Sequence, residues 1–388
     1  MKVLNHEWDE LVARKAGITA SEISNQPGVW RKLADRLEKQ LDDMMGFMGR
    51  MLAIPGIRIV FTGAGSSAFI GESMSLMLMG ESGIRSDVVH STEAVATPEA
   101  CFYDVPTLLI SYSRSGSSPE SCAAIRAAER KTSELHNLVL VCNEDSELAR
   151  MPMDPEQNRV FHIPQEACDQ GFAMTCSVSC MALATWVLFA GDRDEAMRRI
   201  VHIRTLADAA EEQLPMIQKK AEEVARFSYD RIVYLGFGAL RGLSREGAVK
   251  SQELTNGAVC ASYDTPTGFR HGPKTILNDS TLTVFMASPL ELAGMYDRDM
   301  LAELCAHRPN NVVLVAREDL PYETDGPDYQ VRYRSPAEYH LSEMSAYIFS
   351  LLFLQVLSFE KSLAMHITTD NPCPSGEVNR VVQGVSIH

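Results

Sequence analysis

The chain repeats one short pattern, an apolar strand-like segment that runs into a pair of closely spaced glycines. In the first copy IRIVF is followed by Gly63 and Gly65, and in the second RIVYL is followed by Gly236 and Gly238. The two copies are offset by 173 positions (236 − 63). A helix-like segment follows the glycines in both copies, so the pattern predicts a strand, a tight turn and a helix. We interpret the repeat as an internal duplication that gives two halves of the same plan.

Strand-like and helix-like segments alternate through both halves. The strand-like segments are 57–61, 86–90, 107–112, 137–143 and 159–164 in the first half, and 231–235, 280–287, 311–317 and 329–334 in the second. Such alternation predicts right-handed βαβ units and parallel sheets covered by helices, an α/β fold. The polar helical stretch 192–222 carries no strand signal, so we expect the hinge between the halves there.

The length and the charge of the chain exclude several classes of protein. A chain of 388 residues is too long for one ordinary core and fits about two domains of ~150–200 residues. Hydrophobic residues make up 45% of it and charged residues 22%, as in globular proteins. The net charge of −15 disfavours nucleic acid and anionic membranes as partners, so local donors must hold any anionic substrate.

The cysteines and the apolar segments indicate a cytoplasmic protein that does not span a membrane. The nine cysteines are odd in number, scattered and without a Cys-x-x-Cys pair, which favours reduced thiols in a cytoplasm. Cys176 and Cys180 are spaced to share a helical face, where core packing is favoured over a metal site. The amino-terminal segment lacks the apolar core of a signal peptide. Segments 181–190 and 346–359 are shorter than the ~20 residues of a spanning helix, so we expect buried helices.

The loop SRSGSSPES, which begins at Ser113, has the features of a phosphate pocket. It closes the apolar segment 107–112, which suits a strand buried on both faces of a parallel sheet. Ser118 stands where a helix N-cap belongs and Pro119 where the first helical residue belongs. Gly116 lets the backbone approach a ligand, and the free N–H groups of the helix start attract an anion. The hydroxyls of Ser113, Ser115, Ser117 and Ser118 add further donors.

Two other interpretations of these loops stay open. A serine-rich loop can be a simple solvated turn. The spacing of Gly63, Gly65 and Ala68 after a strand also resembles a dinucleotide fingerprint, which requires an acidic residue near the end of the second strand. Asp87 is the candidate for that residue, but it lies near the start of its strand. A small phosphomonoester explains both loops, whereas a dinucleotide explains one.

The second half carries candidate acid-base groups. Lys250 and Glu253 are three residues apart in a helix-like segment and so lie on one face, near its carboxyl end. His271 follows in the turn TGFRHGPK, between glycines. Taken alone, the pair can be a surface ion pair of little energetic weight and the histidine can be merely solvated. Their occurrence together with the two loops makes these residues candidates for a catalytic role.

These motifs, taken in order, resemble the sugar isomerase (SIS) family in its tandem-domain branch. They are the Gly-x-Gly-Ser-Ser loop, the SRSGSSPES loop, the Lys250-x-x-Glu253 helix and the GFRHGP turn. The segment 21–30, SEISNQPGVW, also resembles the lead-in of that branch, and the resemblance covers residues 20–385. The branch includes the isomerase half of glucosamine-fructose-6-phosphate aminotransferase. Within it the chain is similar to the tagatose-6-phosphate ketose/aldose isomerases that act on galactosamine 6-phosphate as deaminases.

The resemblance implies a fold and a domain order. The fold is two tandem SIS domains, each a parallel five-stranded sheet between helices in a flavodoxin-like three-layer arrangement. The domain boundaries that we expect are an amino-terminal helical lead-in at 1–45, a phosphate-binding first SIS domain at 46–200, a second SIS domain with the catalytic Glu and His at 201–367, and a tail over the active site at 368–388.

The resemblance also implies the residues of the site. It places the sugar phosphate on serines of the second loop and other hydroxyls near the sugar. Arg114 stands where the aminotransferase has a glutamine, and we expect it to add a charge to the phosphate site. These substrate-binding residues are Ser66, Ser67, Ser113, Arg114, Ser115, Ser118, Thr175 and Arg380. Glu253 moves a proton between C1 and C2, Lys250 is a neighbouring charge that keeps it ionised, and His271 opens the sugar ring. The resemblance implies no metal or organic cofactor, and a homodimer in which His271 completes the site of the neighbouring subunit.

Two departures from the family bear on the reaction, and the first favours deamination over synthesis. Met1 leads directly into the sugar domain, so we expect free ammonia to be the nitrogen species. Arg380 stands where the aminotransferase has a lysine near its end, and arginine does not readily form an imine. The expected reaction converts galactosamine 6-phosphate into tagatose 6-phosphate and ammonia. The alternatives are an aldose/ketose isomerase without deamination and a non-catalytic phosphosugar-sensing regulator.

Overall fold

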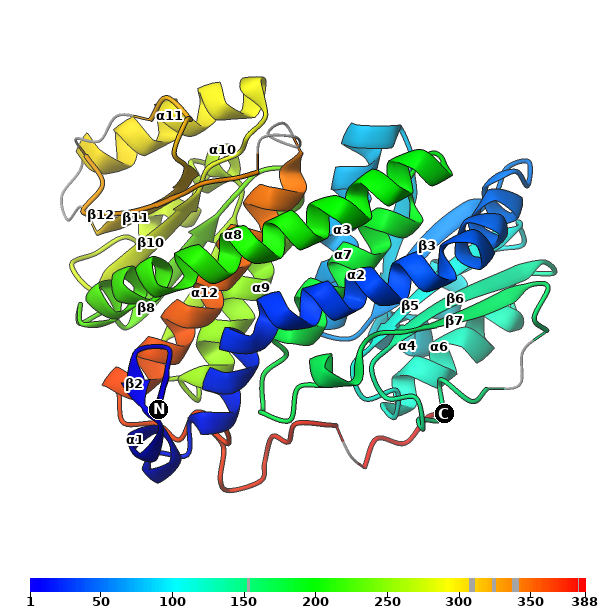
Figure 1. Cartoon of the computed structure of the whole chain (residues 1–388), viewed down its shortest axis with the longest axis horizontal. Coiled ribbons are helices and arrows are strands. Elements are labelled where there is room, and N and C mark those ends of the chain that lie inside the picture. The colour runs from blue at the N-terminus through cyan, green and yellow to red at the C-terminus, as the bar shows by residue number, and fades with distance from the viewer. Residues whose placement is uncertain (152–153, 307–310, 323–325, 337–341, 383) are drawn as a thin grey trace. The chain divides into compact units, whose positions relative to one another are not determined.

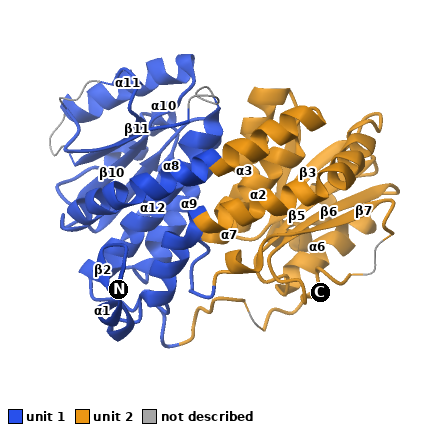
Figure 2. Cartoon of the chain, in the orientation of Figure 1, with its two compact units in different colours: residues 1–27, 170–175, 205–375 blue, residues 28–169, 176–204, 376–388 orange. Residues whose placement is uncertain are grey.

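The computed structural model describes residues 1–151, 154–306, 311–322, 326–336, 342–382 and 384–388. Contacts divide the chain into two compact units (Figure 2). Unit 1 consists of Met1–Pro27, Gln170–Thr175 and Thr205–Ser375, and unit 2 of Gly28–Asp169, Cys176–Arg204 and Gly376–His388. Two long helices, α2 (Gly17–Leu52) and α8 (Arg193–Ala225), therefore contribute to both units. The domain boundaries expected from the sequence stay a prediction.

Unit 2 is built on a parallel five-stranded sheet with the strand order β4-β3-β5-β6-β7 (Figure 1). The strands are β3 (Arg58–Gly63), β4 (Ser86–His90), β5 (Thr107–Ser113), β6 (Leu135–Val141) and β7 (Asn158–His162). All five coincide with the strand-like segments of the first half, which confirms those predictions. β5 is buried along its whole length, as expected for a strand covered on both faces.

Helices cover both faces of the unit 2 sheet. They are α3 (Ser66–Ser82), α4 (Ser91–Ala96), α5 (Pro98–Cys101), α6 (Pro119–Glu129) and α7 (Cys176–Leu188), with a short 3-10 turn η1 (Gln165–Ala167). Val60 and Leu109 pack with Ile125 of α6 in one buried cluster. On the opposite face the ring of Phe61 stacks on Tyr112, whose hydroxyl hydrogen-bonds to α7. The predicted three-layer α/β arrangement is confirmed for this unit.

Unit 1 repeats the plan with the strand order β12-β11-β10-β8-β9, again parallel throughout. The strands are β8 (Arg231–Leu235), β9 (Cys260–Asp264), β10 (Thr281–Met286), β11 (Val312–Arg317) and β12 (Tyr329–Tyr333). Four of them match the sequence-based expectation, and β9 was missed. β9 is an edge strand of partly exposed residues, so its sequence, CASYD, lacks the apolar run that marks a buried strand.

The helices of unit 1 also lie on both faces of its sheet. They are α9 (Ala239–Leu254), α10 (Pro266–Phe269), α11 (Glu291–Ala306) and α12 (Glu343–Ala364), with the 3-10 turn η2 (Pro273–Ile276). At the amino terminus, the unit also contains α1 (Trp8–Ala13) and a short hairpin of β1 (Lys2–Val3) and β2 (His6–Glu7). Phe285 packs with Met300 of α11 on one face. On the other face Tyr234 hydrogen-bonds to Ser251 of α9, and Tyr333 stacks on Phe349 of α12.

α12 is the one helix among the described residues that is long and apolar enough to cross a membrane. Its apolar window is 100% buried inside the structure. It is therefore a core helix of unit 1, as predicted for segment 346–359.

The internal duplication is visible in the backbone. Gly65 caps α3 with φ 55° and ψ −128°, and Gly238 caps α9 with φ 57° and ψ −130°. The left-handed φ favours glycine at both positions. A Cβ built on Gly63 would lie 2.6 Å from the Cβ of the residue four positions on, and one built on Gly236 would lie 2.7 Å from the corresponding atom. The two strand-turn-helix segments thus have the same geometry, which confirms the repeat.

Candidate functional site

The first loop of the candidate site connects β3 to α3 in unit 2. Ser66 and Ser67 are the first two residues of α3, and each is 5% exposed. A Cβ added to Gly65 would meet no atom within 4 Å, so open space lies beside the turn. The N-terminus of this 17-residue helix carries the positive end of the helix dipole. This turn is therefore suited to an anionic or hydroxyl-rich ligand.

The second loop connects β5 to α6 and has the predicted local structure. Ser113 is the last residue of β5, Ser118 is the N-cap of α6 and Pro119 is its first residue, which confirms these three positions. The Ser113 hydroxyl accepts a hydrogen bond of 2.9 Å from the Gly116 N–H. The Ser118 side chain makes no capping hydrogen bond to its own helix. Its hydroxyl is therefore available to a ligand.

The sheet brings these two loops to one edge. β3 and β5 are adjacent parallel strands, with Arg58 paired to Thr107 and Thr62 paired to Ser111. Both loops leave the carboxyl ends of their strands, where open α/β sheets bind ligands. Ser115 lies in the second loop, where its hydroxyl accepts a 3.3 Å hydrogen bond from the N–H of Ser117. The five predicted serines thus belong to two neighbouring turns of unit 2.

Arg114 and Arg380 are linked within unit 2. Arg114 is 7% exposed, and its Nη2 donates a 2.7 Å hydrogen bond to the main-chain carbonyl of Arg380. The guanidinium of Arg380 donates in turn to the carbonyl of Asp169, with Nε at 2.8 Å. The Asp169 carboxylate accepts the N–H groups of Cys176 and Ser177 at the start of α7. The segment that carries Arg380 is therefore hydrogen-bonded to Arg114, the residue after Ser113.

Thr175 belongs to unit 1, whereas the serines belong to unit 2. It is fully buried, and its carbonyl accepts a 3.1 Å hydrogen bond from Gln355 of α12. It directly precedes Cys176, the first residue of α7.

The predicted acid-base pair lies on α9 and includes a third charge. Lys250 is 0% exposed, and its ammonium bonds to Glu253, whose side chain is 29% exposed. The same ammonium lies 3.6 Å from Oε1 of Glu246, whose side chain is 2% exposed. Lys250 thus stands between one buried and one accessible carboxylate, and Glu253 is the carboxylate that a ligand can reach. The sequence analysis missed Glu246, although its spacing of four residues from Lys250 signals a contact on a helix.

His271 lies on an exposed turn that salt bridges fix at both ends. It follows α10, and its N–H donates a 2.9 Å hydrogen bond to the carbonyl of Gly268. Arg270 on one side bonds to Glu303 of α11 at 2.7 Å, and Lys274 on the other side bonds to the same carboxylate. The hydrogen bond from Lys274, opposed by burial, and the further bond from Arg270 lower the pKa of Glu303. The imidazole is accordingly presented on an anchored turn.

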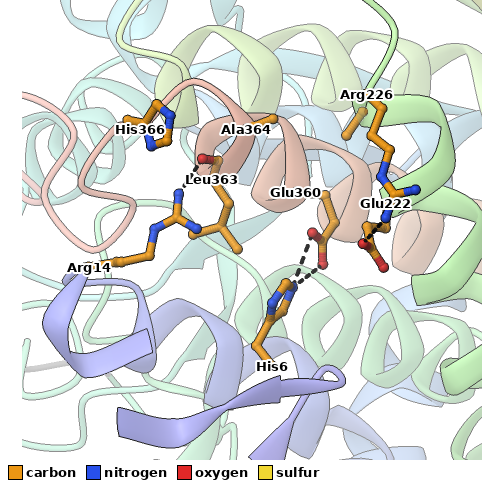
Figure 3. Close-up of a pocket in the computed structure, with 9 residues that line it drawn as sticks. His6, Arg14, Glu222, Arg226, Glu360, Leu363, Ala364 and His366 are labelled. Atoms are coloured by element: carbon orange, nitrogen blue, oxygen red, sulfur yellow. Dashed lines mark hydrogen bonds and ion pairs between the residues drawn. The ribbon is translucent and has the colours of Figure 1, made fainter. Parts of the chain in front are cut away.

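A separate charged cavity of about 260 Å³ lies in unit 1 at the ends of α8 and α12 (Figure 3). Nε2 of His6 lies 2.9 Å and 3.2 Å from the two carboxylate oxygens of Glu360, which is 3% exposed. The hydrogen bond with Glu360 raises the pKa of His6, against the effect of burial, and attraction to Glu10 and Glu222 adds to the rise. No local pattern signals this cluster, because His6 and Glu360 are 354 residues apart in the sequence.

Comparison with known proteins identifies the family. The SIS domain profile matches residues 51–191. The chain is 36% identical over 375 residues to the D-galactosamine-6-phosphate deaminase AgaS of Escherichia coli O157:H7, an alignment that covers 95% of each protein. The chain belongs to the SIS domain family. The predicted membership of the SIS family is thereby confirmed, and the two repeated five-stranded sheets agree with its tandem-domain branch.

Solved structures of SIS proteins share the whole fold. A candidate tagatose-6-phosphate ketose/aldose isomerase from Clostridium novyi NT superposes with a TM-score of 0.93 at 35% identity, covering 100% of this chain and 99% of that one. The tagatose-6-phosphate ketose/aldose isomerase of Escherichia coli superposes with a TM-score of 0.84 at 33% identity, covering 96% of each chain. The likeness thus extends over both units and not only over the segment that the SIS profile matches.

Proposed function

We propose that this chain is an amino-sugar 6-phosphate deaminase that converts galactosamine 6-phosphate and water into tagatose 6-phosphate and ammonia. The observation that carries the proposal is the 36% identity with AgaS of Escherichia coli O157:H7 across 95% of both chains. The two serine loops at one sheet edge support a phosphate group as part of the substrate. The accessible carboxylate on α9 supports proton transfer.

The proposed binding roles follow the two loops of unit 2. Ser113, Ser115 and Ser118 bind the phosphate through hydroxyl and N–H donors, and the Arg114 guanidinium adds a positive charge. The hydroxyls of Ser66, Ser67 and Thr175 bind the sugar. Arg380 fastens the segment beside Arg114 through its bonds to the Asp169 carbonyl.

The proposed chemistry is a proton shuttle followed by addition of water. His271 moves the ring-opening proton from the C1 hydroxyl to the ring oxygen, which gives the open aldehyde. Glu253 removes the proton from C2 and returns it to C1, while a proton passes from the amino nitrogen to O1, which converts the aminoaldehyde into a C2 imine with a C1 hydroxyl. Water adds to the imine carbon and ammonia leaves, which yields the ketose. The Lys250 ammonium, which is bonded to Glu253, supplies a neighbouring positive charge.

A second candidate function is aldose/ketose isomerisation without loss of nitrogen. It is favoured by the two solved structures named as tagatose-6-phosphate ketose/aldose isomerases, at 33% and 35% identity. An ammonia-release assay across a panel of hexosamine 6-phosphates separates the two functions. Ammonia from galactosamine 6-phosphate supports the deaminase, and ketose formation only from nitrogen-free hexose phosphates refutes it.

We also propose that the protein acts in the cytoplasm as a homodimer in which His271 serves the site of the partner subunit. The free state of all nine cysteines is compatible with a reducing compartment. The exposed turn that carries His271 supports the shared site.

Two inactive variants test the roles of Glu253 and His271 together. Removing either group lowers ammonia release by about 10²- to 10⁴-fold, the usual contribution of a general acid or base. If Glu253 of one subunit works with His271 of the other, mixing the E253Q and H271A proteins with subunit exchange restores about one quarter of wild-type activity, because half of the dimers then hold one intact site. Full activity of E253Q contradicts the assignment of the base. Absence of recovery in a verified mixed dimer contradicts the shared site.

A further inference from the structure

The second glycine turn has kept its shape but has lost its hydroxyls. Gly65 and Gly238 adopt the same conformation within a few degrees. With the same offset of 173 positions, Ser66 corresponds to Ala239 and Ser67 to Leu240. The side-chain donors that open α3 therefore have no counterparts at the start of α9.

The turn after the next strand has changed in the same way. In unit 2 Arg58 of β3 pairs with Thr107 of β5, and in unit 1 Arg231 of β8 pairs with Thr281 of β10. Counted from these pairs, Ala287 corresponds to Ser113 and directly follows the last residue of β10. The hydroxyl that closes β5 is thus replaced by a methyl group.

A carboxylate of the protein itself is seated on the second glycine turn. Glu343, the first residue of α12, is 3% exposed, and its Oε1 accepts a 3.0 Å hydrogen bond from the Ala239 N–H. A Cβ added to Gly238 would lie 2.1 Å from that oxygen, whereas the space beside Gly65 is open. An anion therefore already occupies the N-terminus of α9, in the place that stays open at α3.

The other turn of unit 1 is closed in the same manner by a second carboxylate. Asp297 of α11 is 0% exposed, and its Oδ2 accepts a 2.8 Å hydrogen bond from the Ser288 N–H. Ser288 is the residue that corresponds to Arg114. Each of the two corresponding turns in unit 1 thus binds a buried carboxyl group of its own unit, and burial raises the pKa of Asp297 to about 7.

We propose that Glu343 is a built-in anion that replaces a ligand at the second glycine turn and thereby positions α9 for the reaction. The inference rests on the proposed function, because α9 carries Lys250 and Glu253. Glu343 acts through the helix and is a positioning residue, not a catalytic one. A carboxylate bonded to the free N–H groups of a helix start stabilises that helix end. The inference also implies one phosphate site per chain, in unit 2.

Chemical rescue tests the positioning role. The E343A variant leaves a carboxylate-sized space at the glycine turn, and we expect kcat for ammonia release to fall about tenfold while KM changes less than twofold. Added formate fills the space and restores kcat with saturation, and it leaves the wild type unaffected. E291A is the matched control, because Glu291 is likewise the first residue of a helix but is exposed. We expect wild-type kcat and no effect of formate for E291A.

Thermal unfolding gives a readout that does not depend on the proposed reaction. Formate raises the melting temperature of E343A and leaves that of the wild type and E291A unchanged. If the wild type releases no ammonia from any hexosamine phosphate, the proposed function fails, and the melting experiment still decides the role of Glu343. Wild-type activity of E343A overturns the proposal, and so does a folded E343A that formate neither stabilises nor reactivates.

The E343Q variant covers the case in which E343A does not fold. Its amide oxygen still accepts the Ala239 N–H but carries no charge, so we expect a lower melting temperature than that of the wild type and a threefold or smaller loss of kcat. A melting temperature and kcat equal to those of the wild type would show that the negative charge has no role, and would overturn the proposal.

Discussion

Replacing Lys250 with methionine tests whether one buried ammonium holds two carboxylates in place on α9. The variant keeps the volume of the side chain and removes its charge. Lys250 is 0% exposed and lies 3.6 Å from Glu246, which is 2% exposed. At that separation the Coulomb attraction is about 5 kcal/mol for an effective dielectric constant of ~20. Burial of both charges offsets part of that attraction, but removing one partner leaves the other in a poorly solvated interior.

The expected loss is therefore larger than that of a surface ion pair. We expect K250M to lower the free energy of unfolding by about 3–5 kcal/mol, the usual cost of breaking a buried pair. E246Q removes the other buried charge, so the double variant K250M/E246Q loses less than the sum of the two single variants. Loss of the contact with Glu253 contributes about 1 kcal/mol or less, because that carboxylate is 29% exposed.

Urea unfolding followed by circular dichroism measures these differences for the four proteins of the cycle. E253Q serves as the control for the accessible contact. If the free energy of unfolding of K250M lay within about 1 kcal/mol of the wild-type value, the reasoning would be refuted, because the Lys250 charge would not be needed in the core. Additive effects in the double variant would show that Lys250 and Glu246 do not interact.

Two further predictions concern the serine loop and the charged cavity. We expect Gly116→Ala to raise KM in the ammonia-release assay and to lower the melting temperature, because its φ is +62° and a Cβ there would lie 2.0 Å from the Ser146 hydroxyl; wild-type values would contradict this. We expect His6→Gln to destabilise the protein by about 1–2 kcal/mol below pH 6.5, and less as the pH rises. The hydrogen bond with Glu360 raises the pKa of His6 in the folded protein. The protonated pair therefore stabilises the protein fully below the pKa that His6 has in the unfolded chain, and this stabilisation is lost as the pH rises through the folded pKa. A stability difference between wild type and variant that grows from pH 6 to pH 9 would contradict that sign.

Local signals in the sequence were sufficient for the serine loop. Ser113, Ser118 and Pro119 were placed correctly because the end of an apolar strand and an N-cap followed by proline are read within a few residues. The strand β9 was missed because an edge strand need not be apolar. Local propensity determines the structure of the serine loop, whereas the place of β9 at the sheet edge depends on tertiary contacts.

Local sequence patterns could not predict the carboxylate contacts inside unit 1. Glu343 meets Ala239 across 104 residues of sequence, so only the folded chain reveals the contact. Glu246 is different, because its spacing from Lys250 on a helix was present in the sequence. The burial of Glu246 could not be read from the sequence, and burial makes the loss of one partner of this ion pair costly.

Unit 1 combines segments from far apart in the chain, and this affects how the protein is made. The Thr19 N–H donates a 2.8 Å hydrogen bond to Asp370, 351 residues later. A ribosome that adds roughly 5–20 residues per second needs roughly 18–70 seconds for that stretch. Until residues 355–370 are made, the nascent segment before Pro27 lacks its partners Gln355, Glu360, Leu363 and Asp370, while most of unit 2 has already been synthesised. We expect newly made chains to depend on chaperones at that segment, and partly synthesised chains to be cleaved there by proteases.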